Sequence, residues 1–158
     1  YKLSVKSLQG TIPMVIANLK KIKILKISKI QLSGSLPWGV LDISSLEVIG
    51  LQGNSLSGSL PVGICSRLQG LTSLDLSYND LSGIIPSSLT ECSKLQLLSL
   101  FDNHFSGMIP ERFGNLTALK GLYLSGNNLH GTFLTIAFEL KYIHIYIYIY
   151  IYISLFFF

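Results

Sequence analysis

Leucine and isoleucine recur along the middle of the chain in a fixed frame, L-x-x-L-x-L-x-x-N-x-L. One copy occupies residues 71–81, and further copies begin at Leu46, Leu95 and Leu119. Within the L-x-L part of each copy, apolar residues alternate with other residues at a period of two, which predicts a short strand with its leucines pointing inward. Because the frame repeats, the strands of successive copies are expected to stack in parallel.

A second pattern, Gly-x-Ile/Leu-Pro, follows three of these four copies and also occurs twice before the first of them; after the last copy, Phe133 and Leu134 stand where Ile and Pro belong. The pattern recurs at nearly constant spacing, with its glycine at Gly10, Gly34, Gly58, Gly83 and Gly107. A short, regular period of this kind is typical of a leucine-rich-repeat solenoid. The glycine permits a turn with positive φ, and the proline presets φ for the segment that returns across the coil. We therefore predict an α/β solenoid, a right-handed superhelix with parallel strands on its concave face and irregular or short helical segments on its convex face.

One asparagine in each central copy stands just after the strand, at an inward position. An asparagine side chain both donates and accepts hydrogen bonds, so it can satisfy backbone groups where the chain leaves the sheet. These residues are expected to form a ladder along the solenoid: Asn54, Asn79, Asn103 and Asn127.

The complete unit, L-x-x-L-x-L-x-x-N-x-L-x-G-x-I-P, resembles the extracellular repeats of plant leucine-rich-repeat receptor-like kinases and receptor-like proteins. The resemblance covers residues 1–132, about five repeats. It implies part of an ectodomain on the extracellular side of the plasma membrane that binds a peptide or protein ligand, or a co-receptor. Secreted inhibitors of the polygalacturonase-inhibitor type share the repeat and are the alternative. The family's cysteine-bearing caps have no counterpart at either end, so we interpret the chain as an internal fragment.

Outward strand positions of the three central coils are the candidate ligand contacts, because neighbouring strands present them on one continuous surface. They combine acids, hydroxyls and aromatic rings, a mixture suited to peptide recognition. An ordinary solvated sheet face is the alternative interpretation. The candidates are Ser73, Asp75, Ser77, Tyr78, Ser99, Phe101, Asp102, Tyr123 and Ser125.

Composition and motifs favour recognition and not catalysis. Seven lysines and no acid occur between Tyr1 and Lys29. Several of these lysines alternate with inward apolar residues, which favours a solvated face over a nucleic-acid site. The chain has no nucleophile elbow, no metalloprotease helix motif and neither of the kinase motifs H-R-D and D-F-G. We expect no enzymatic activity, no cofactor, no metal site and no nucleic-acid partner.

Two cysteines and one sequon bear on the cellular compartment. Cys65 and Cys92 lie in neighbouring return segments but at different distances from their prolines, so buried free thiols are favoured over a disulfide bond between the coils. Asn115-Leu116-Thr117 is an N-x-S/T sequon and a candidate glycosylation site on a secreted surface.

The C-terminal segment 133–158 is hydrophobic and distinct from the repeats, and tyrosine and isoleucine alternate in it from Tyr142 onward. A TA dinucleotide repeat translates as Tyr-Ile in every reading frame, so our first interpretation of this segment is translated noncoding DNA. A short membrane anchor over residues 142–158 is the alternative, because this stretch carries no Asp, Glu, Lys or Arg. The alternation itself favours strand over helix.

Overall fold

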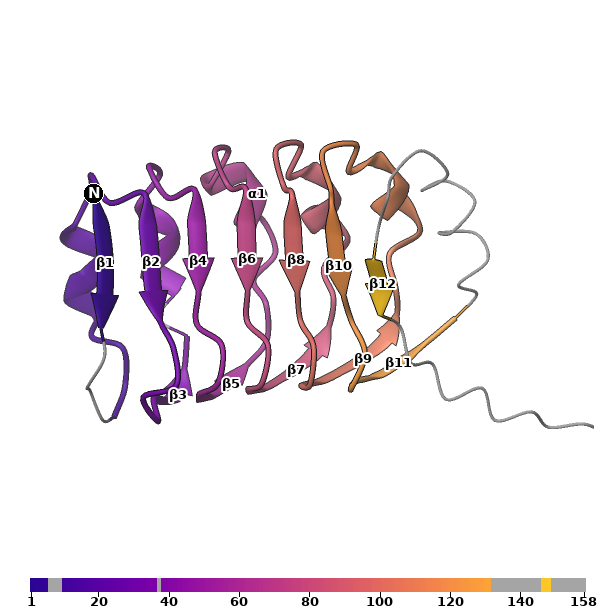
Figure 1. The fold of residues 1–158 in the computed structure, drawn as a ribbon, viewed down its shortest axis with the longest axis horizontal. Helices are drawn as coiled ribbons and strands as arrows, with labels where there is room; N and C mark the ends of the chain where they lie inside the picture. The colour runs from indigo at the N-terminus through magenta and orange to yellow at the C-terminus, as the bar shows by residue number, and fades with distance from the viewer. Residues whose placement is uncertain (6–9, 37, 132–145, 149–158) are drawn as a thin grey trace, which may run out of the picture.

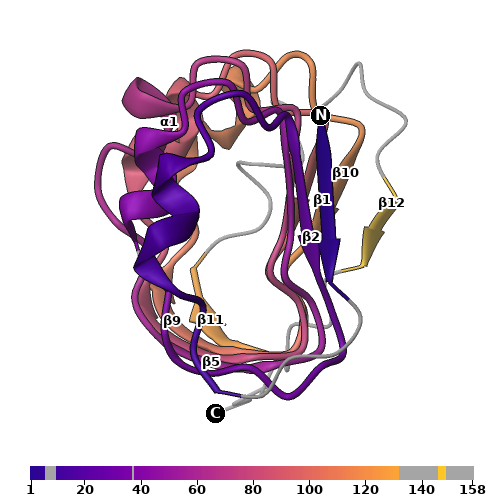
Figure 2. The same ribbon diagram turned by 90° about the vertical axis from the view of Figure 1, so that its left-hand side faces the viewer.

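The chain forms a stack of parallel coils, shown side by side in Figure 1. The structure is a computed structural model that describes residues 1–5, 10–36, 38–131 and 146–148. Viewed along the stack in Figure 2, the long sheet lies on one side, short helices lie on the opposite side and a second sheet runs along the edge that joins them. This arrangement confirms the predicted solenoid.

The long sheet is built from one strand of each coil. Its seven strands are parallel and follow the order β1-β2-β4-β6-β8-β10-β12. Their inward leucines and isoleucines stand in register across the sheet, as in the row Leu25, Ile49, Leu74, Leu98 and Leu122. The strands are β1 (Lys2–Val5), β2 (Ile24–Ile27), β4 (Val48–Gly50), β6 (Ser73–Asp75), β8 (Leu97–Ser99), β10 (Gly121–Tyr123) and β12 (Tyr146–Tyr148).

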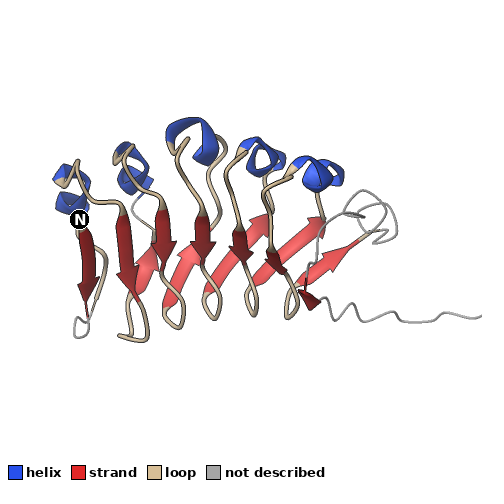
Figure 3. Ribbon diagram, turned by 45° about the horizontal axis from the view of Figure 1, so that its top comes forward, coloured by secondary structure: helices blue, strands red, loops and turns tan. Residues whose placement is uncertain are grey.

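Short helices cover the side of the solenoid opposite the long sheet, as the blue segments of Figure 3 show. Pro13, Pro86 and Pro110 each stand directly before a 3-10 helix with φ between −58° and −66°, so the proline of the Gly-x-Ile/Leu-Pro pattern does begin the return segment. The helical segments are η1 (Met14–Asn18), η2 (Trp38–Asp42), α1 (Ile64–Arg67), η3 (Ser87–Glu91) and η4 (Glu111–Asn115).

The second sheet is a feature that the sequence patterns did not predict. It runs in the order β11-β9-β7-β5-β3 and is also parallel. Four of the five glycines of the repeated pattern lie within it, and Gly10 forms an isolated bridge to Leu32. Gly83 and Gly107 have φ of +85° and +83°, and a Cβ on Gly107 would lie 3.1 Å from the Ile84 side chain of the preceding coil. The strands are β3 (Ser33–Ser35), β5 (Ser55–Gly58), β7 (Asp80–Ile84), β9 (His104–Met108) and β11 (Asn128–His130).

The space between these layers holds one continuous apolar core that extends along the described coils. The inward leucines of the long sheet meet apolar residues of the return segments, and Phe105 and Phe113 are fully buried in the later coils. Each such leucine contributes about 1.5–3 kcal/mol relative to an exposed side chain. Because every coil packs mainly on its neighbours, this stabilisation is distributed along the solenoid.

The four asparagines connect neighbouring coils through their side-chain amides. The Nδ2 of Asn103 donates to the carbonyl oxygens of Leu76 and Leu100 at 3.0 and 3.2 Å, and its Oδ1 accepts from the amide of Leu81 at 3.0 Å. Asn103 is 5% exposed, so water cannot replace these bonds. Equivalent bonds are made by Asn54, Asn79 and Asn127.

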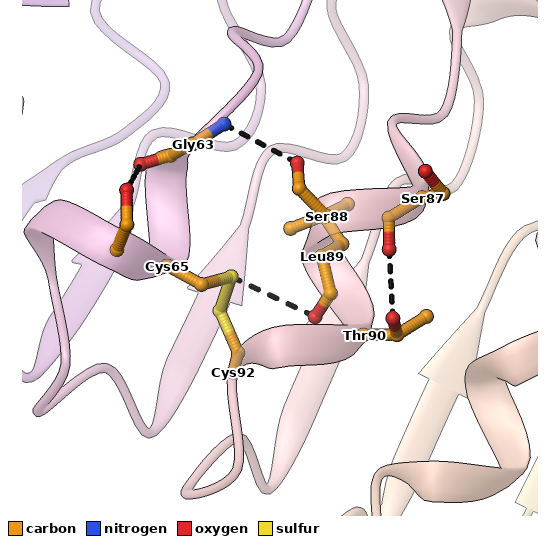
Figure 4. The surroundings of a disulfide bond; sticks show 8 residues. Gly63, Cys65, Ser87, Ser88, Leu89, Thr90 and Cys92 are labelled. Atoms are coloured by element: carbon orange, nitrogen blue, oxygen red, sulfur yellow. Dashed lines mark hydrogen bonds between the residues drawn. A yellow bond between two sulfur atoms is a disulfide. The ribbon is translucent and has the colours of Figure 1, made fainter.

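Our expectation of free thiols is wrong, because Cys65 and Cys92 form a disulfide bond (Figure 4). Cys65 lies in α1 and Cys92 directly follows η3, and these two helical segments pack against each other. The sequence registers of the cysteines differ, yet the short α-helix of one coil and the 3-10 helix of the next bring their Cα atoms to 4.9 Å. Both residues are buried, so the bond lies inside the convex layer.

Most of the hydrophobic segment 133–158 lies outside the described residues. Of this segment the structure describes only β12, which pairs in parallel with β10 and so continues the long sheet by one strand. Among the described residues, no helix has the length and apolar character that crossing a bilayer would require. The proposed membrane anchor at residues 142–158 therefore stays a prediction, as does the interpretation as translated noncoding DNA.

Candidate functional site

The concave face is the side of the long sheet that faces away from the core. Strand register places its outward residues in rows across the coils, and one row reads Lys26, Gly50, Asp75, Ser99 and Tyr123. Small residues therefore alternate with longer ones along this row. Adjacent strands are about 4.8 Å apart, so each small residue leaves a gap about one side chain wide between its longer neighbours.

A hollow of about 570 Å³ opens on this face over β6, β8 and β10. This volume lies within the range of about 300–1,000 Å³ that is usual for ligand sites. Seven of the nine sequence-predicted contact residues line it together, along with one residue that was not predicted. The lining residues are Asp75, Ser77, Tyr78, Leu97, Ser99, Phe101, Tyr123 and Ser125.

Two aromatic residues from neighbouring coils meet at the hollow. The rings of Tyr78 and Phe101 pack edge to face, with centroids 5.0 Å apart and planes at 70°. Tyr78 stands directly before a ladder asparagine in the left-handed backbone conformation, with φ of +54°. Gly53 and Gly126 hold this conformation at the same place in their coils. Tyr78 therefore has a backbone conformation that is better suited to glycine. Its side chain is 54% exposed and lies beside Phe101.

Asp75 presents a carboxylate whose orientation is set by its own coil. Its Oδ1 accepts a hydrogen bond from the hydroxyl of Ser77 at 2.6 Å and another from the Ser77 amide at 3.1 Å. No Lys, Arg or His forms an ion pair with it within the described part of the chain. The carboxylate is therefore held in place by neutral donors, and no described cation neutralises its charge.

Three serines that were expected on an exposed strand face lie instead at the bottom of the hollow. Ser77, Ser99 and Ser125 are 7%, 8% and 4% exposed. The Oγ of Ser125 is buried and has no hydrogen-bond partner among the described residues. Since a buried polar atom without a partner is costly, this hydroxyl is available to a ligand that enters the hollow.

The remaining predicted contacts lie beside the hollow. Ser73 is half-buried at the preceding outward position of β6, and Asp102 is exposed in a loop, where its amide donates to the Ser125 carbonyl at 2.9 Å. Sequence reasoning overlooked Leu97, which forms part of the wall. The period-two pattern puts Leu97 at an outward position, and an apolar residue at such a position is a signal that could have identified it.

Charged residues elsewhere on the described coils are spread along the surface. The described N-terminal lysines are exposed, and Lys23 pairs with Glu47 at 2.6 Å. Arg67 pairs with Asp42 at 2.7 Å on the convex side. Both pairs are about half exposed, so each contributes little to stability. Within the described residues, no three His, Cys, Asp or Glu side chains gather as a metal site would require.

Solved structures similar to this chain include plant receptor ectodomains. The family model described as leucine rich repeat matches residues 44–105. The ectodomain of the receptor kinase SOBIR1 from Arabidopsis thaliana is 39% identical, with a TM-score of 0.74, over 80% of this chain and 68% of that one. A chain of the BIR3–SERK2 complex from the same plant is 37% identical, with a TM-score of 0.73, over 83% of this chain and 69% of that one.

Longer receptor ectodomains also match. The ectodomain of the Arabidopsis membrane receptor kinase GASSHO1/SCHENGEN3, solved with CASPARIAN STRIP INTEGRITY FACTOR 2, is 37% identical with a TM-score of 0.80 and covers 87% of this chain. The chain spans only 16% of that ectodomain, and 21% and 20% of two further receptor structures. Comparison with curated protein sequences finds no match.

Proposed function

This chain belongs to the leucine-rich-repeat family of plant receptor ectodomains, and from that premise we propose that it recognises an extracellular peptide or protein ligand through the concave hollow. The parent protein would be a receptor-like serine/threonine kinase or a receptor-like protein at the plasma membrane that acts in signalling, with immune signalling as one candidate role. The repeat fold is a recognition fold, and no kinase motif occurs in the sequence. Any kinase would therefore lie outside these residues.

The observation that carries the proposal is the arrangement of the hollow. Three coils together line one surface that carries the aromatic pair Tyr78 and Phe101. The same surface carries the Asp75 carboxylate, which forms no ion pair among the described residues, and the buried Ser125 hydroxyl, which has no hydrogen-bond partner among them. Aromatic anchors beside hydrogen-bonding groups are the residues that dominate binding energy at protein interfaces. Two similar structures are complexes with peptide ligands, that of the peptide hormone receptor RGFR1 with RGF2 and that of HAESA with an IDA peptide hormone. A peptide is therefore the first ligand class to test.

Peptide binding tests this function directly. The full chain, secreted from plant or insect cells and immobilised, is exposed to a library of synthetic peptides that represents secreted plant peptides. We expect saturable binding by a small subset, and replacing Phe101 with alanine should weaken it about tenfold or more, as for an interface anchor. Tyr1→Ala is the matched control, since Tyr1 is an exposed aromatic residue in the first coil. Peptides that bind Phe101→Ala as tightly as the original chain would contradict the proposal.

Glycosylation of Asn115 is a second expectation for a secreted ectodomain. Asn115 ends η4 and Thr117 lies just beyond it, and both are exposed. When the chain is secreted from eukaryotic cells, mass spectrometry should detect an N-linked glycan that Asn115→Gln removes. Asn128→Gln, at an exposed asparagine outside any sequon, should leave the glycan in place. A secreted chain with unmodified Asn115 would refute the assignment.

The glycan would stand on the opposite side of the solenoid from the hollow. Asn115 borders a convex depression whose rim includes the exposed side chains of Val62, Ile84 and Met108. A sugar attached there would cover part of this apolar surface and leave the concave face open. Peptide binding is therefore expected to be the same before and after enzymatic removal of the glycan.

A further inference from the structure

The hollow over β6, β8 and β10 combines one carboxylate with three aromatic residues, and no cationic side chain is among the described residues that line it. We propose that it is a subsite for a cationic side chain of the ligand, an arginine guanidinium or a lysine ammonium group. This inference rests on the proposed function, because it names the chemistry of the ligand group that enters the same surface.

Asp75 supplies the charge for this subsite. Both hydrogen bonds that it accepts within the described chain go to Oδ1, so Oδ2 is available to a ligand. The donors of those bonds, the amide and hydroxyl of Ser77, hold the carboxylate in one orientation before any ligand arrives. A cation that reaches Oδ2 forms a charge-assisted hydrogen bond, which is about twice as strong as a neutral one.

The aromatic residues supply walls that suit a cation better than an anion. Tyr78 and Phe101 are fixed against each other by their edge-to-face contact, and Tyr123 belongs to the third coil that lines the hollow. A guanidinium or ammonium group within about 6 Å of a ring centroid is attracted by the negative face of the ring. The aliphatic stem of arginine or lysine would at the same time pack on Leu97, which is half-buried in the wall.

The charges around Asp75 agree with a site for a cation, because no Lys, Arg or His is among the described residues that line the hollow. The buried hydroxyl of Ser125 lacks a partner within the described chain, but it belongs to the third coil, two strand spacings from the coil of Asp75. It is therefore available to another donor group of the ligand and not to the cation that pairs with Asp75. Along the row of outward residues, the next ionisable side chain before Asp75 is Lys26, and Gly50 stands between them. Two strand spacings, roughly 10 Å, separate those positions, so the lysine belongs to a different part of the face.

Blocked amino acids test the subsite without knowledge of the natural ligand. The probes are the N-acetyl methylamides of arginine, lysine and citrulline, titrated into the full chain labelled with ¹⁵N. Citrulline has nearly the shape of arginine but no charge. We expect arginine and lysine to shift the amide signals of residues 75–78 and 97–101, and arginine to bind about tenfold more tightly than citrulline, a difference of about 1.4 kcal/mol.

Two variants that remove one negative charge each give a matched comparison. Asp75→Asn keeps an oxygen that can accept both Ser77 bonds, so the chain should fold, and the preference for arginine over citrulline should disappear. Asp80→Asn removes an equivalent charge from an exposed aspartate on the second sheet and should leave the preference intact. Any of three results overturns the proposal: the arginine and citrulline probes bind equally well, the preference for arginine persists in Asp75→Asn, or neither cationic probe binds.

The outcome also separates this inference from the proposed function. If library peptides still require Phe101 while the arginine probe binds no better than citrulline, the concave hollow remains the recognition surface and the cationic subsite is wrong. If library peptides bind independently of Phe101, the proposed function fails whatever the probes do. If both tests succeed, the peptides selected from the library should carry arginine or lysine at one shared position.

Discussion

Replacing Cys65 and Cys92 together with alanine is expected to lower the free energy of unfolding by about 3–4 kcal/mol, the usual effect of a crosslink that closes a loop of this length. The two cysteines are 27 residues apart, and their bond joins two neighbouring coils. Losing it would increase the conformational freedom of the unfolded chain and release the contact between α1 and η3. Alanine is preferable to serine here, because the site is buried and a serine hydroxyl would lack a partner.

Urea denaturation of the oxidised chain and of the double variant measures this effect. The control is the same comparison under strong reductant, where the original chain should lose its advantage and unfold at nearly the same urea concentration as the variant. Two free thiols detected by alkylation of the denatured oxidised protein would show that the disulfide bond is absent. An oxidised chain that is no more stable than the variant would show that the bond has no effect on stability.

Asn103→Ala is expected to cost about 3–5 kcal/mol, because it leaves one buried amide and several carbonyls without their partner, and each such group costs about 1–3 kcal/mol. The groups belong to neighbouring coils, since Asn103 bonds to Leu76, Leu81 and Leu100. The variant should therefore loosen the contact between its own coil and the preceding one. Removing a surface asparagine should have a far smaller effect.

Asn128→Ala is the matched control, because Asn128 is exposed and lies outside the ladder, and its removal should change stability by no more than about 0.5 kcal/mol. Urea denaturation of both variants, with hydrogen exchange to locate the loss, provides the measurement. We expect faster exchange at the amide of Leu81, the donor to the missing oxygen. Equal stability of the two variants would mean that the asparagine ladder is dispensable.

Much of the fold could be predicted because the repeat imposes the same constraint at every coil. The alternation around Leu74 and Leu76 determines which side chains point inward, and the frame length places each strand beside its predecessor. The proline of each Gly-x-Ile/Leu-Pro pattern has no amide hydrogen and a restricted φ, which locates the start of the return segment. These effects are local, and local effects are visible in a single sequence.

The second sheet was missed because its strands do not alternate in the usual way. In β7, only Leu81 is buried, and Gly83 adopts a positive φ within the strand. Its pairing depends on contact with β5 and β9, whose positions follow from the long sheet and not from their own composition. When a strand forms because neighbouring strands hold it in place, its own residues need not alternate between apolar and polar.

The disulfide bond and the details of the hollow depend on geometry between coils. The two cysteines stand at different distances from the prolines of their coils, so the sequence did not suggest a bond between them. The short α-helix of one coil and the 3-10 helix of the next nevertheless bring Cys65 and Cys92 together. In the same way, the outward position of Ser125 is evident from its coil, whereas its burial depends on neighbouring side chains. The sequence thus predicted which residues point outward from the sheet, but it did not predict how far each of their side chains is exposed to solvent.

A crystal structure of the full chain with the tightest-binding peptide from the library would show whether the concave hollow is the recognition site. We expect the peptide to cross the outward faces of β6, β8 and β10, to contact Phe101 and Tyr78, and to place a basic side chain beside Asp75. A peptide bound to the convex helices or to the second sheet, with the concave hollow left open, would contradict the claim that this hollow is the recognition site.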